Sequence, residues 1–234
     1  MRSIVAFVSL YATKATIDLY GVGMPATLDE LTVADPPQAW GDCGFAVEGD
    51  TCSAGEVRIR FASAEGERGL RGWSLRDVAS LDLDGLPTAE SDRPPLGEAP
   101  AHPNGVTGLD HVVAISSDLD RTVAALVAAG LDLRRVREEP TPAGAPRQAF
   151  FRLGGTILEV VQEPPEATER HGGDRPAFFW GLAFTAPDLE RTVAFLGERV
   201  SESRPAVQPR RRIATLRRSA RLSVPVALIT PPSG

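Results

Sequence analysis

Lysine and cysteine are nearly missing from this chain of 234 residues. Lysine occurs only at Lys14, although lysine and arginine together number 25, so arginine carries almost all of the basic charge. Cysteine occurs only at Cys43 and Cys52, which is too few for a disulfide framework and lacks the paired spacing of a zinc site. We therefore expect ordinary thiols in a cytoplasmic protein, and the arginine-, alanine- and proline-rich composition indicates a bacterial source.

Long apolar runs and an excess of positive charge are also missing. No apolar stretch approaches the roughly 20 residues that a membrane span needs. The apolar residues from Ile4 to Leu10 are interrupted early, and no small-residue cleavage site follows, so we expect a strand over Ser3 to Leu10 rather than a signal peptide. A net charge of -6 argues against a general polyanion binder. Neither membrane nor nucleic acid is expected as a partner.

A compositional boundary divides the chain. Residues 85–107 are dense in proline, glycine, alanine and small polar residues and lack apolar periodicity, which is typical of a linker. The boundary leaves an N-terminal region of residues 1–84 and a second region of residues 108–234.

The second region contains an internal repeat. At an offset of 70 residues, DLDRTVAAL (Asp118 to Leu126) meets DLERTVAFL (Asp188 to Leu196) with seven of nine positions identical. Such self-similarity indicates one supersecondary unit used twice. Asp118 and Asp188 each stand where a helix N-cap is expected, and this role explains their recurrence without any catalytic one.

Each copy of the repeat is predicted to be a βαβββ unit, because a short β-branched strand precedes the helix and three strand-like runs follow it. In the first copy the helix is closed by Gly130. The predicted modules span residues 108–163 and 178–231. Their strands are expected at 108–115, 131–137, 147–153 and 156–162, and at 178–185, 200–203, 210–217 and 222–230.

The N-terminal region is harder to interpret. It shows a short helix-like segment at Pro37 to Cys43 and strand-like segments at 3–10, 44–49, 56–61 and 69–78. We interpret residues 1–84 as a degenerate βαβββ-like module, with a regulatory or scaffold role as the weakest of the functional alternatives.

The arrangement of GLDHVV, a helix beginning DLDRT, and a last strand TILEVV resembles the vicinal oxygen chelate superfamily, which includes glyoxalases, extradiol dioxygenases and bleomycin resistance proteins. The resemblance covers about 125 residues. It implies an α+β fold in which tandem βαβββ modules form a curved eight-stranded mixed sheet with helices on the outside. It also implies that His111 matches the metal ligand of a first strand, and Glu159 the ligand of a last strand.

Strand alternation agrees with that placement. It puts Leu109, His111 and Val113 on one face, and Glu159 on a face with Ile157 and Val161. A carboxylate among apolar neighbours is costly to bury without a partner. Either a divalent metal such as Zn, Fe, Mn or Ni is shared between His111 and Glu159, or Glu159 pairs with an arginine and His111 is a structural histidine. The candidate arginines are Arg152 and Arg147.

The second module does not complete a metal site. At the 70-residue offset His111 meets Gly181, and alignment of the terminal Pro-Pro pairs sets Glu159 against Val226. A metal set would therefore require pairing of first modules in a homodimer, or a residue such as His102, His171 or Asp110. Otherwise the site has become a metal-free binding cleft. His102 and His171 are expected to be exposed loop residues.

Two further groups of residues bear on the ligand. Phe150, Phe151 and Trp180 lie on predicted strands bordering the cleft, where aromatic walls suit a flat or hydrophobic ligand, although core packing explains about half of such aromatics. Seven arginines between Arg204 and Arg221 either bind an anionic tail or form a solvated edge.

Two functions follow from these patterns. One is a metal-dependent isomerase, lyase or dioxygenase acting on a small oxygen-rich or aromatic molecule, with Glu159 as catalytic base or ligand. The other is metal-free sequestration of a hydrophobic small molecule.

Overall fold

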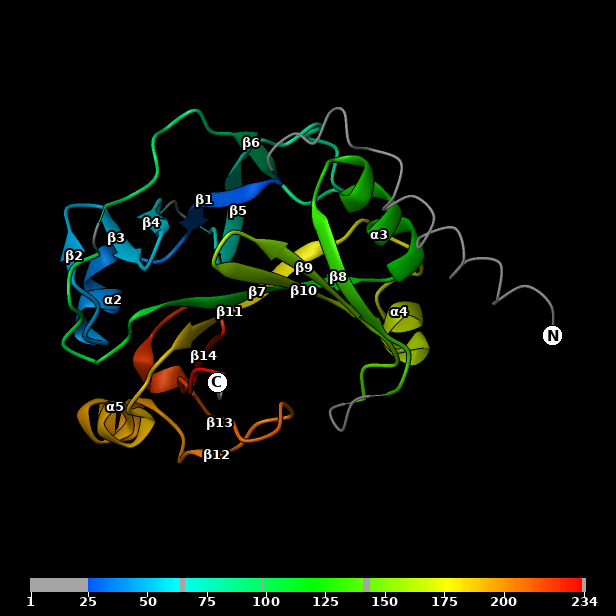
Figure 1. The fold of residues 1–234 in the computed structure, drawn as a ribbon. Helices are drawn as coiled ribbons and strands as arrows, with labels where there is room; N and C mark the ends of the chain where they lie inside the picture. Colours follow the sequence, from blue (N-terminus) through cyan, green and yellow to red (C-terminus); the bar gives the residue numbers. More distant parts are fainter. Residues whose placement is uncertain (1–24, 64–65, 98, 141–143, 233–234) are drawn as a thin grey trace.

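The computed structural model contains two β-sheets that lie face to face (Figure 1). The structure describes residues 25–63, 66–97, 99–140 and 144–232. The strand predicted at Ser3 to Leu10 lies outside these residues.

The eight-stranded sheet is built from two units of the same topology. The first consists of β7 (Gly108–Ser116), α3 (Leu119–Ala128), β8 (Asp132–Arg137), β9 (Gln148–Leu153) and β10 (Thr156–Gln162). The second consists of β11 (Phe178–Thr185), α5 (Leu189–Leu196), β12 (Arg204–Pro205), β13 (Arg212–Thr215) and β14 (Val226–Ile229), with the 3-10 turns η1 (Gly197–Arg199) and η2 (Arg218–Ala220). Helix α4 (Pro165–Arg170) joins the two units and was not predicted.

The strand order is β12-β13-β14-β11-β7-β10-β9-β8. Within each unit the first and last strands are parallel, β7 to β10 and β11 to β14, and the other pairs are antiparallel. The two first strands, β7 and β11, pair antiparallel at the centre of the sheet. The predicted α+β class, with tandem βαβββ modules in one mixed eight-stranded sheet, is therefore confirmed.

The repeated helices begin in the same way. Asp118 and Asp188 each accept a hydrogen bond from the backbone N–H three residues later, at 3.0 Å in both cases. This satisfies one of the free amides of each first turn, so both aspartates are helix N-caps as predicted. Gly130 follows α3 with φ of 88°, a left-handed conformation that favours glycine, and it ends the helix there.

The six-stranded sheet contains β1 (Thr27–Val33), β2 (Val47–Glu48), β3 (Thr51–Ala54), β4 (Val57–Phe61), β5 (Leu70–Arg76) and β6 (Thr88–Glu90), with α2 (Pro37–Asp42) after β1. Its order is β2-β3-β4-β1-β5-β6, with β1 parallel to β4 and antiparallel to β5. The order β2-β3-β4-β1 is the same as β8-β9-β10-β7 in the other sheet. Helix α2 was predicted, but the central strand β1 was not.

The segment predicted to be a linker, residues 85–107, is tied into this sheet. It contributes β6 alongside β5, and it buries Leu86, Ser91 and Asn104. The Asn104 side chain donates to the Cys43 carbonyl at 2.9 Å and accepts from the Val106 amide at 3.0 Å. Residues 85–107 lack apolar periodicity because isolated residues of the segment make its contacts. No helix or strand in the described part of the segment buries one continuous face.

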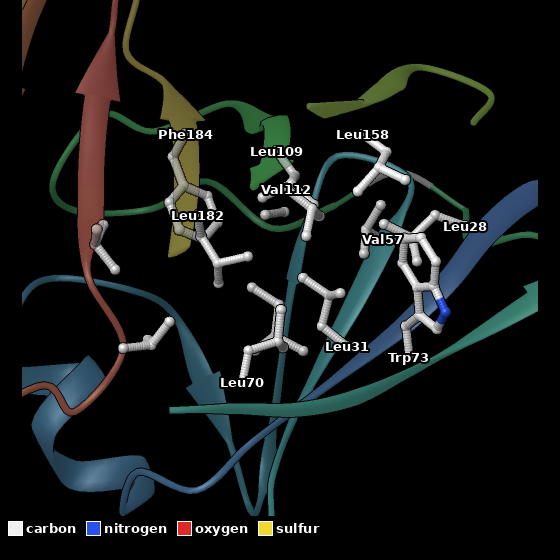
Figure 2. Packing of buried hydrophobic residues seen from close by; sticks show 14 of the residues in the cluster. Leu28, Leu31, Val57, Leu70, Trp73, Leu109, Val112, Leu158, Leu182 and Phe184 are labelled. Atoms are coloured by element: carbon white, nitrogen blue, oxygen red, sulfur yellow. The ribbon is translucent and has the colours of Figure 1, made fainter. Parts of the chain in front are cut away.

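One hydrophobic core fills the space between the sheets (Figure 2). Its members from the six-stranded sheet include Leu28, Leu31, Val57, Leu70 and Trp73, and those from the eight-stranded sheet include Leu109, Val112, Leu158, Leu182 and Phe184. Helix α3 packs against β8, β9 and β10, and helix α5 packs against β13. One face of the eight-stranded sheet is thus buried. We call the opposite face the open face.

The second module departs most from the prediction. The strand expected at residues 200–203 is replaced by η1, a single bridge from Val200 to Leu216, and the two-residue strand β12. The last strand is limited to Val226–Ile229 because Pro225 has no backbone N–H to donate to a neighbouring strand. No helix among the described residues is both long and apolar enough to cross a membrane.

Candidate functional site

The register of the strands arranges the side chains of the open face in rows. Directly paired residues point to the same side of a sheet. One row contains Arg135, Phe150, Glu159, Val113 and Gly181, in order across five strands. The adjacent row contains Asp132, Arg152, Ile157, His111, Ala183 and Ala227. His111 and Glu159 are therefore diagonal neighbours on one face.

The structure brings the two residues together. His111 Nε2 lies 3.6 Å from Glu159 Oε2, and the two side chains are 13% and 14% exposed. This separation is too long for a direct hydrogen bond but short enough for one ligand atom to contact both groups. A substrate oxygen, a water or a metal ion would fit the geometry of this pair equally well.

A β-bulge next to His111 shapes the site. Leu109 pairs with Phe184 and His111 pairs with Ala183, so Asp110 is an extra residue in β7. Bulges commonly redirect side chains beside functional sites. The bulge turns Leu109 into the buried core, where it is 5% exposed. Alternation alone placed Leu109 beside His111, and that expectation is wrong because it assumed an uninterrupted strand.

Asp110 contacts the His111 ring at Nδ1, the ring nitrogen that does not face Glu159. Its Oδ1 lies 2.7 Å from His111 Nδ1. The same carboxylate pairs with Arg211 Nη2 and, at 3.3 Å, with Arg211 Nη1. Arg211 is fixed in turn by donating its Nε–H to the Thr230 carbonyl at 2.6 Å. An anionic partner on Nδ1 favours the tautomer with a proton there, which leaves Nε2 free to face Glu159.

The two carboxyl groups have opposite electrostatic environments. Burial tends to raise the pKa of Asp110, but hydrogen bonds and charge from His111 and Arg211 outweigh it and lower that pKa. Burial raises the pKa of Glu159; the Asp110 charge adds to this rise, while His111 and Arg137 oppose it. Gln148 donates its side-chain N–H to Glu159 Oε1. The surroundings of Asp110 therefore favour its anionic form, whereas those of Glu159 favour its protonated form.

The arginine partners considered for Glu159 lie elsewhere. Arg147 donates to Glu138 at 2.7 Å and to Asp120 at 3.0 Å, on the edge of the module. Arg152 donates to the Gly154 carbonyl at 3.2 Å. Neither forms an ion pair with Glu159, so the arginine alternative is not realised by these two residues.

The predicted aromatic residues fall on different faces. Phe150 pairs with Glu159 and shares the open face. Phe151 is fully buried and belongs to the hydrophobic core, because adjacent strand residues alternate between faces. A direct contact of Phe151 with a ligand on the open face is therefore excluded by its position. Trp180 is 52% exposed and is an extra residue in β11, between Phe179 and Gly181.

The second module offers no matching pair. The extra residues Asp110 and Trp180 stand 70 positions apart, so Gly181 corresponds to His111, as the offset predicted. Ile157 pairs with His111, and Glu159 follows two positions later on the same face. In the second module Leu182 pairs with Val226, so the residue opposite Gly181 is the one before Val226. Two positions after that residue is Ala227, which therefore corresponds to Glu159. The sequence alignment with Val226 was wrong by one residue.

The other ligands considered do not complete the site. His102 is buried beside Phe45, which lies in the segment between α2 and β2, and its Nδ1 accepts from the Ala46 amide at 2.9 Å. The prediction of an exposed His102 is therefore wrong. His171 is half-exposed, with Nδ1 2.8 Å from Glu163. Within the described residues, no three histidine, cysteine, aspartate or glutamate side chains are grouped closely enough to hold a metal ion.

The six-stranded sheet repeats the frame of this site with different residues. Asp29 is an extra residue between Leu28 and Glu30 in β1, as Asp110 is in β7. Glu30 pairs with Arg58, and two positions later Arg60 occupies the place that Glu159 has in β10. Arg60 Nε lies 2.9 Å from Glu30 Oε1. A closed ion pair thus stands where the other sheet has the open His111–Glu159 pair.

Arginines also surround Asp29, which is fully buried. Its carboxylate pairs with Arg58 and Arg76, and with Arg93 at 3.1 Å, and it accepts a hydrogen bond from Ser91 at 2.7 Å. Arg93 also reaches Glu30 at 2.9 Å. These contacts hold the segment after β6 across the face of the six-stranded sheet.

A separate hollow lies between the six-stranded sheet and the β9–β10 turn. Its lining includes Thr27, Glu56, Arg76 and Gly154. Neither His111 nor Glu159 lines it, and it lacks a comparable group of interacting titratable side chains. The open face therefore remains the candidate site.

Sequence reasoning missed part of the site. Gln148 and Arg211 were not singled out, and Asp110 was considered only as a metal ligand. Arg211 is 101 residues from Asp110 in the chain, so no local pattern indicates their contact. The position of Asp110 did indicate a bulge, because Asp110 and His111 are successive ionisable residues. In a regular half-buried strand, one of the two would have to point into the core.

Comparisons with known proteins agree with this architecture. Residues 108–219 match the family model described as Glyoxalase/Bleomycin resistance protein/Dioxygenase superfamily. A search of curated proteins finds no match. Among solved structures, a xylose isomerase-like TIM barrel/4-hydroxyphenylpyruvate dioxygenase fusion protein is similar over 97% of this chain and 53% of its own, with 12% identity and a TM-score of 0.61.

Shorter structures match part of the chain. The methylmalonyl-CoA epimerase from Mycobacterium tuberculosis is 22% identical over 55% of this chain and 91% of its own, with a TM-score of 0.45. A variant of the Streptomyces coelicolor epimerase is 21% identical over 55% of this chain and 96% of its own, with a TM-score of 0.44. By its family model and its tandem βαβββ sheet, the region covering residues 108–219 belongs to the glyoxalase/bleomycin resistance protein/dioxygenase superfamily.

Proposed function

We propose that this protein binds a small molecule on the open face and moves a proton on it with His111 and Glu159, as an isomerase or lyase does. The observation that carries the proposal is the chain of contacts from Arg211 through Asp110 to His111, which faces Glu159 across 3.6 Å. A buried carboxyl group beside an oriented imidazole is a common arrangement for general acid and base catalysis.

Each residue has a distinct role in this proposal. Glu159, whose pKa is raised by burial, takes or gives a proton at Oε2. His111 Nε2 faces the same space and supplies the second proton-transfer group. Asp110 positions the imidazole through Nδ1, and Gln148 holds the other oxygen of Glu159. A carbon acid beside a carbonyl group is the simplest substrate class for such a pair.

A divalent metal does not fit as a complete centre. A carboxylate on the outer nitrogen is common for metal-binding histidines, and Asp110 fulfils that condition. However, His111 and Glu159 supply two ligand atoms, whereas catalytic metal sites usually have about three protein ligands. Both edges of β7 are already paired, so a second chain cannot add its first module there. The proposed proton transfer therefore uses only the side chains of His111 and Glu159.

Proton exchange tests the proposal even while the substrate is unidentified. A panel of small 2-oxo acids, 2-hydroxy acids and aromatic ketones is incubated with the protein in deuterium oxide, and deuterium uptake at carbon is followed by NMR. We expect uptake in at least one compound, and its loss in His111→Asn and Glu159→Gln. Matched controls are His171→Asn and Glu169→Gln, which change the same residue types away from the open face.

The outcomes are distinct. Uptake that survives both site variants would contradict the assigned roles. Uptake that disappears with chelator and returns with a divalent ion would show that a metal performs the step, and the acid-base proposal would then be wrong.

Sequestration without turnover is the second candidate. The second module lacks a counterpart of either His111 or Glu159, and Phe178 and Trp180 are 39% and 52% exposed on the same strand. Aromatic surface of this kind suits stacking with a flat ligand. Tight binding of an aromatic compound that persists in Glu159→Gln, with no deuterium uptake in any compound, would favour this function.

We further propose that residues 27–61 are a third, degenerate βαβββ copy with a structural role. The shared strand order and the matching extra residues Asp29 and Asp110 support this proposal. Because Glu30 and Arg60 neutralise each other, this copy keeps no free acid-base pair.

A further inference from the structure

We infer that the molecule bound on the open face carries an anionic group, a carboxylate or a phosphate, and that Arg135, Arg137 and Arg152 bind it. We call these three residues the arginine edge. The inference rests on the proposed function, because it names the substrate class of the same site.

The arginine edge borders the His111–Glu159 pair on one side. Arg135 pairs with Phe150, which pairs with Glu159. Arg137 pairs with Gln148, the residue that donates to Glu159. Arg152 pairs with Ile157 and therefore lies one strand beyond it in the row of His111. All three side chains start from the open face.

These arginines lack close carboxylate partners among the described residues. Arg137 has a carboxylate only at 3.9 Å, from the exposed Glu139. Arg152 donates to a carbonyl, and Arg135 has no ion pair with a described residue. By contrast Arg147, at the start of the same hairpin, has two carboxylates within 3.0 Å. Three guanidinium groups without a close carboxylate therefore lie on the side of the open face that borders Glu159.

The charges on this part of the open face are unbalanced. Of the nearby carboxylates, Asp132 pairs with Arg134 at 3.2 Å, and Glu159 lies in a site where burial raises its pKa. Arg137 is near enough to Glu159 to act on the charge of that carboxylate. An anion at the arginine edge would restore the balance, and guanidinium groups bind carboxylates and phosphates with two parallel hydrogen bonds.

The spacing limits the size of the ligand. Arg135 and Glu159 are two strands apart, which corresponds to about 10 Å between their backbones. Phe150 lies between them in the same row. A small organic acid with its anionic end on the arginine edge and an apolar segment over Phe150 would place a carbon beside Glu159.

Protection of a sheet edge is the competing explanation, because β8 is an edge strand and charged residues prevent edges from pairing. This explanation accounts for arginines on β8. It does not account for Arg152, which lies on the interior strand β9, and it predicts no selective affinity for an anion.

Binding of paired probes tests the inference. Benzoate and phenyl phosphate are compared with the neutral benzamide and phenol, by NMR titration of the full chain. Charge-assisted hydrogen bonds correspond to about tenfold to a hundredfold in affinity. We therefore expect at least one anion to bind about tenfold tighter than its neutral counterpart. Arg137→Gln should remove most of this difference, and Arg135→Gln and Arg152→Gln should reduce it.

The control variant is Arg191→Gln, which removes the same charge from helix α5 and should leave the preference unchanged. The comparison of benzoate with phenyl phosphate shows which anion the arginine edge prefers. Equal or absent binding of the anionic and neutral probes would overturn the inference, as would an anion preference that survives Arg137→Gln.

The inference and the proposed function fail in different ways. Anion preference without deuterium uptake would leave a binding site and remove the proton-transfer role. Deuterium uptake with no anion preference would keep the roles of His111 and Glu159 and remove the arginine edge.

Discussion

At the scale of single residues, the proposed site should depend on Asp110, which contacts His111 on the ring nitrogen that faces away from Glu159. Asp110 occupies a bulge, bonds His111 Nδ1 at 2.7 Å and is itself held by Arg211. We expect it to act as a positioning residue, which sets the tautomer of the imidazole rather than exchanging protons.

Replacement of Asp110 tests this role. Asp110→Asn keeps the size of the side chain but removes the anion, so His111 should lose its preference for a proton on Nδ1. We expect deuterium uptake to fall by about tenfold to a thousandfold and the 15N shifts of His111 to report a changed tautomer. Asp132→Asn, on the same face, is the control. An unchanged tautomer would show that Asp110 is merely structural.

The Glu159 carboxyl group should lower stability at neutral pH. Burial raises its folded pKa, so its ionised form is disfavoured. The cost is absent below the ordinary carboxyl pKa of 4.5 and grows as pH rises through the folded value. We expect Glu159→Gln to stabilise the protein by about 1 to 2 kcal/mol at pH 7, and by much less at pH 4. Urea unfolding at both pH values measures this, and destabilisation at pH 7 would contradict it.

The residues of the site were only partly predictable from sequence. His111 and Glu159 were singled out by strand alternation and family resemblance, and their 3.6 Å separation agrees with that placement, although their roles remain predictions. Arg211 was not found because its contact with Asp110 depends on how two modules pair. Phe151 was assigned to the ligand because the phase of β9 cannot be determined from two adjacent aromatics.

At the scale of elements, the strands with regular apolar patterns were predicted and β1 was not. Residues 27–33 read TLDELTV, and two successive acidic residues argue against a buried strand. The structure buries both, because arginines from β4, β5 and the segment after β6 neutralise them. A strand whose charges are paired only by distant residues has no local signal.

This ion network should be essential for the six-stranded sheet. Asp29→Asn leaves Arg58 and Arg76 beside a neutral group, although both are mostly buried. We expect a loss of about 3 kcal/mol or more in the free energy of unfolding. Glu67→Gln, which breaks an exposed pair with Arg71, should change it by less than about 1 kcal/mol. Urea unfolding compares the two, and equal effects would mean that the buried network adds nothing.

At the scale of the whole molecule, we expect the two sheets to fold as one unit across the described residues. Both contribute to a single hydrophobic core (Figure 2), and the segment after β6 is fastened to the six-stranded sheet before the chain enters β7. The sequence suggested two regions and a linker because the alternation of apolar and polar residues stops at residues 85–107, and such a stretch is typical of a linker. It does not reveal that two amphipathic sheets cover each other.

Phe184 tests whether the two sheets unfold together, because it lies in β11 but packs against helix α2 and the segment that follows it, which connect β1 to β2 of the six-stranded sheet. Its ring centroid lies 5.8 Å from that of Trp40 and 5.1 Å from that of Phe45. Phe184→Ala should destabilise the protein by about 3 to 5 kcal/mol. Since the core is shared, amide hydrogen exchange at Ile59 in β4 and at Val112 in β7 should accelerate together.

Val207→Ala, at a side chain that is 56% exposed, is the matched control and should alter neither amide. If Val112 lost protection while Ile59 kept it, the two sheets would unfold independently. In that case the six-stranded sheet would be an attached domain, and covering the buried face of the eight-stranded sheet would not be its role. If both amides lost protection together, the buried core between the two sheets would be what keeps the eight-stranded sheet, and therefore its open face, folded.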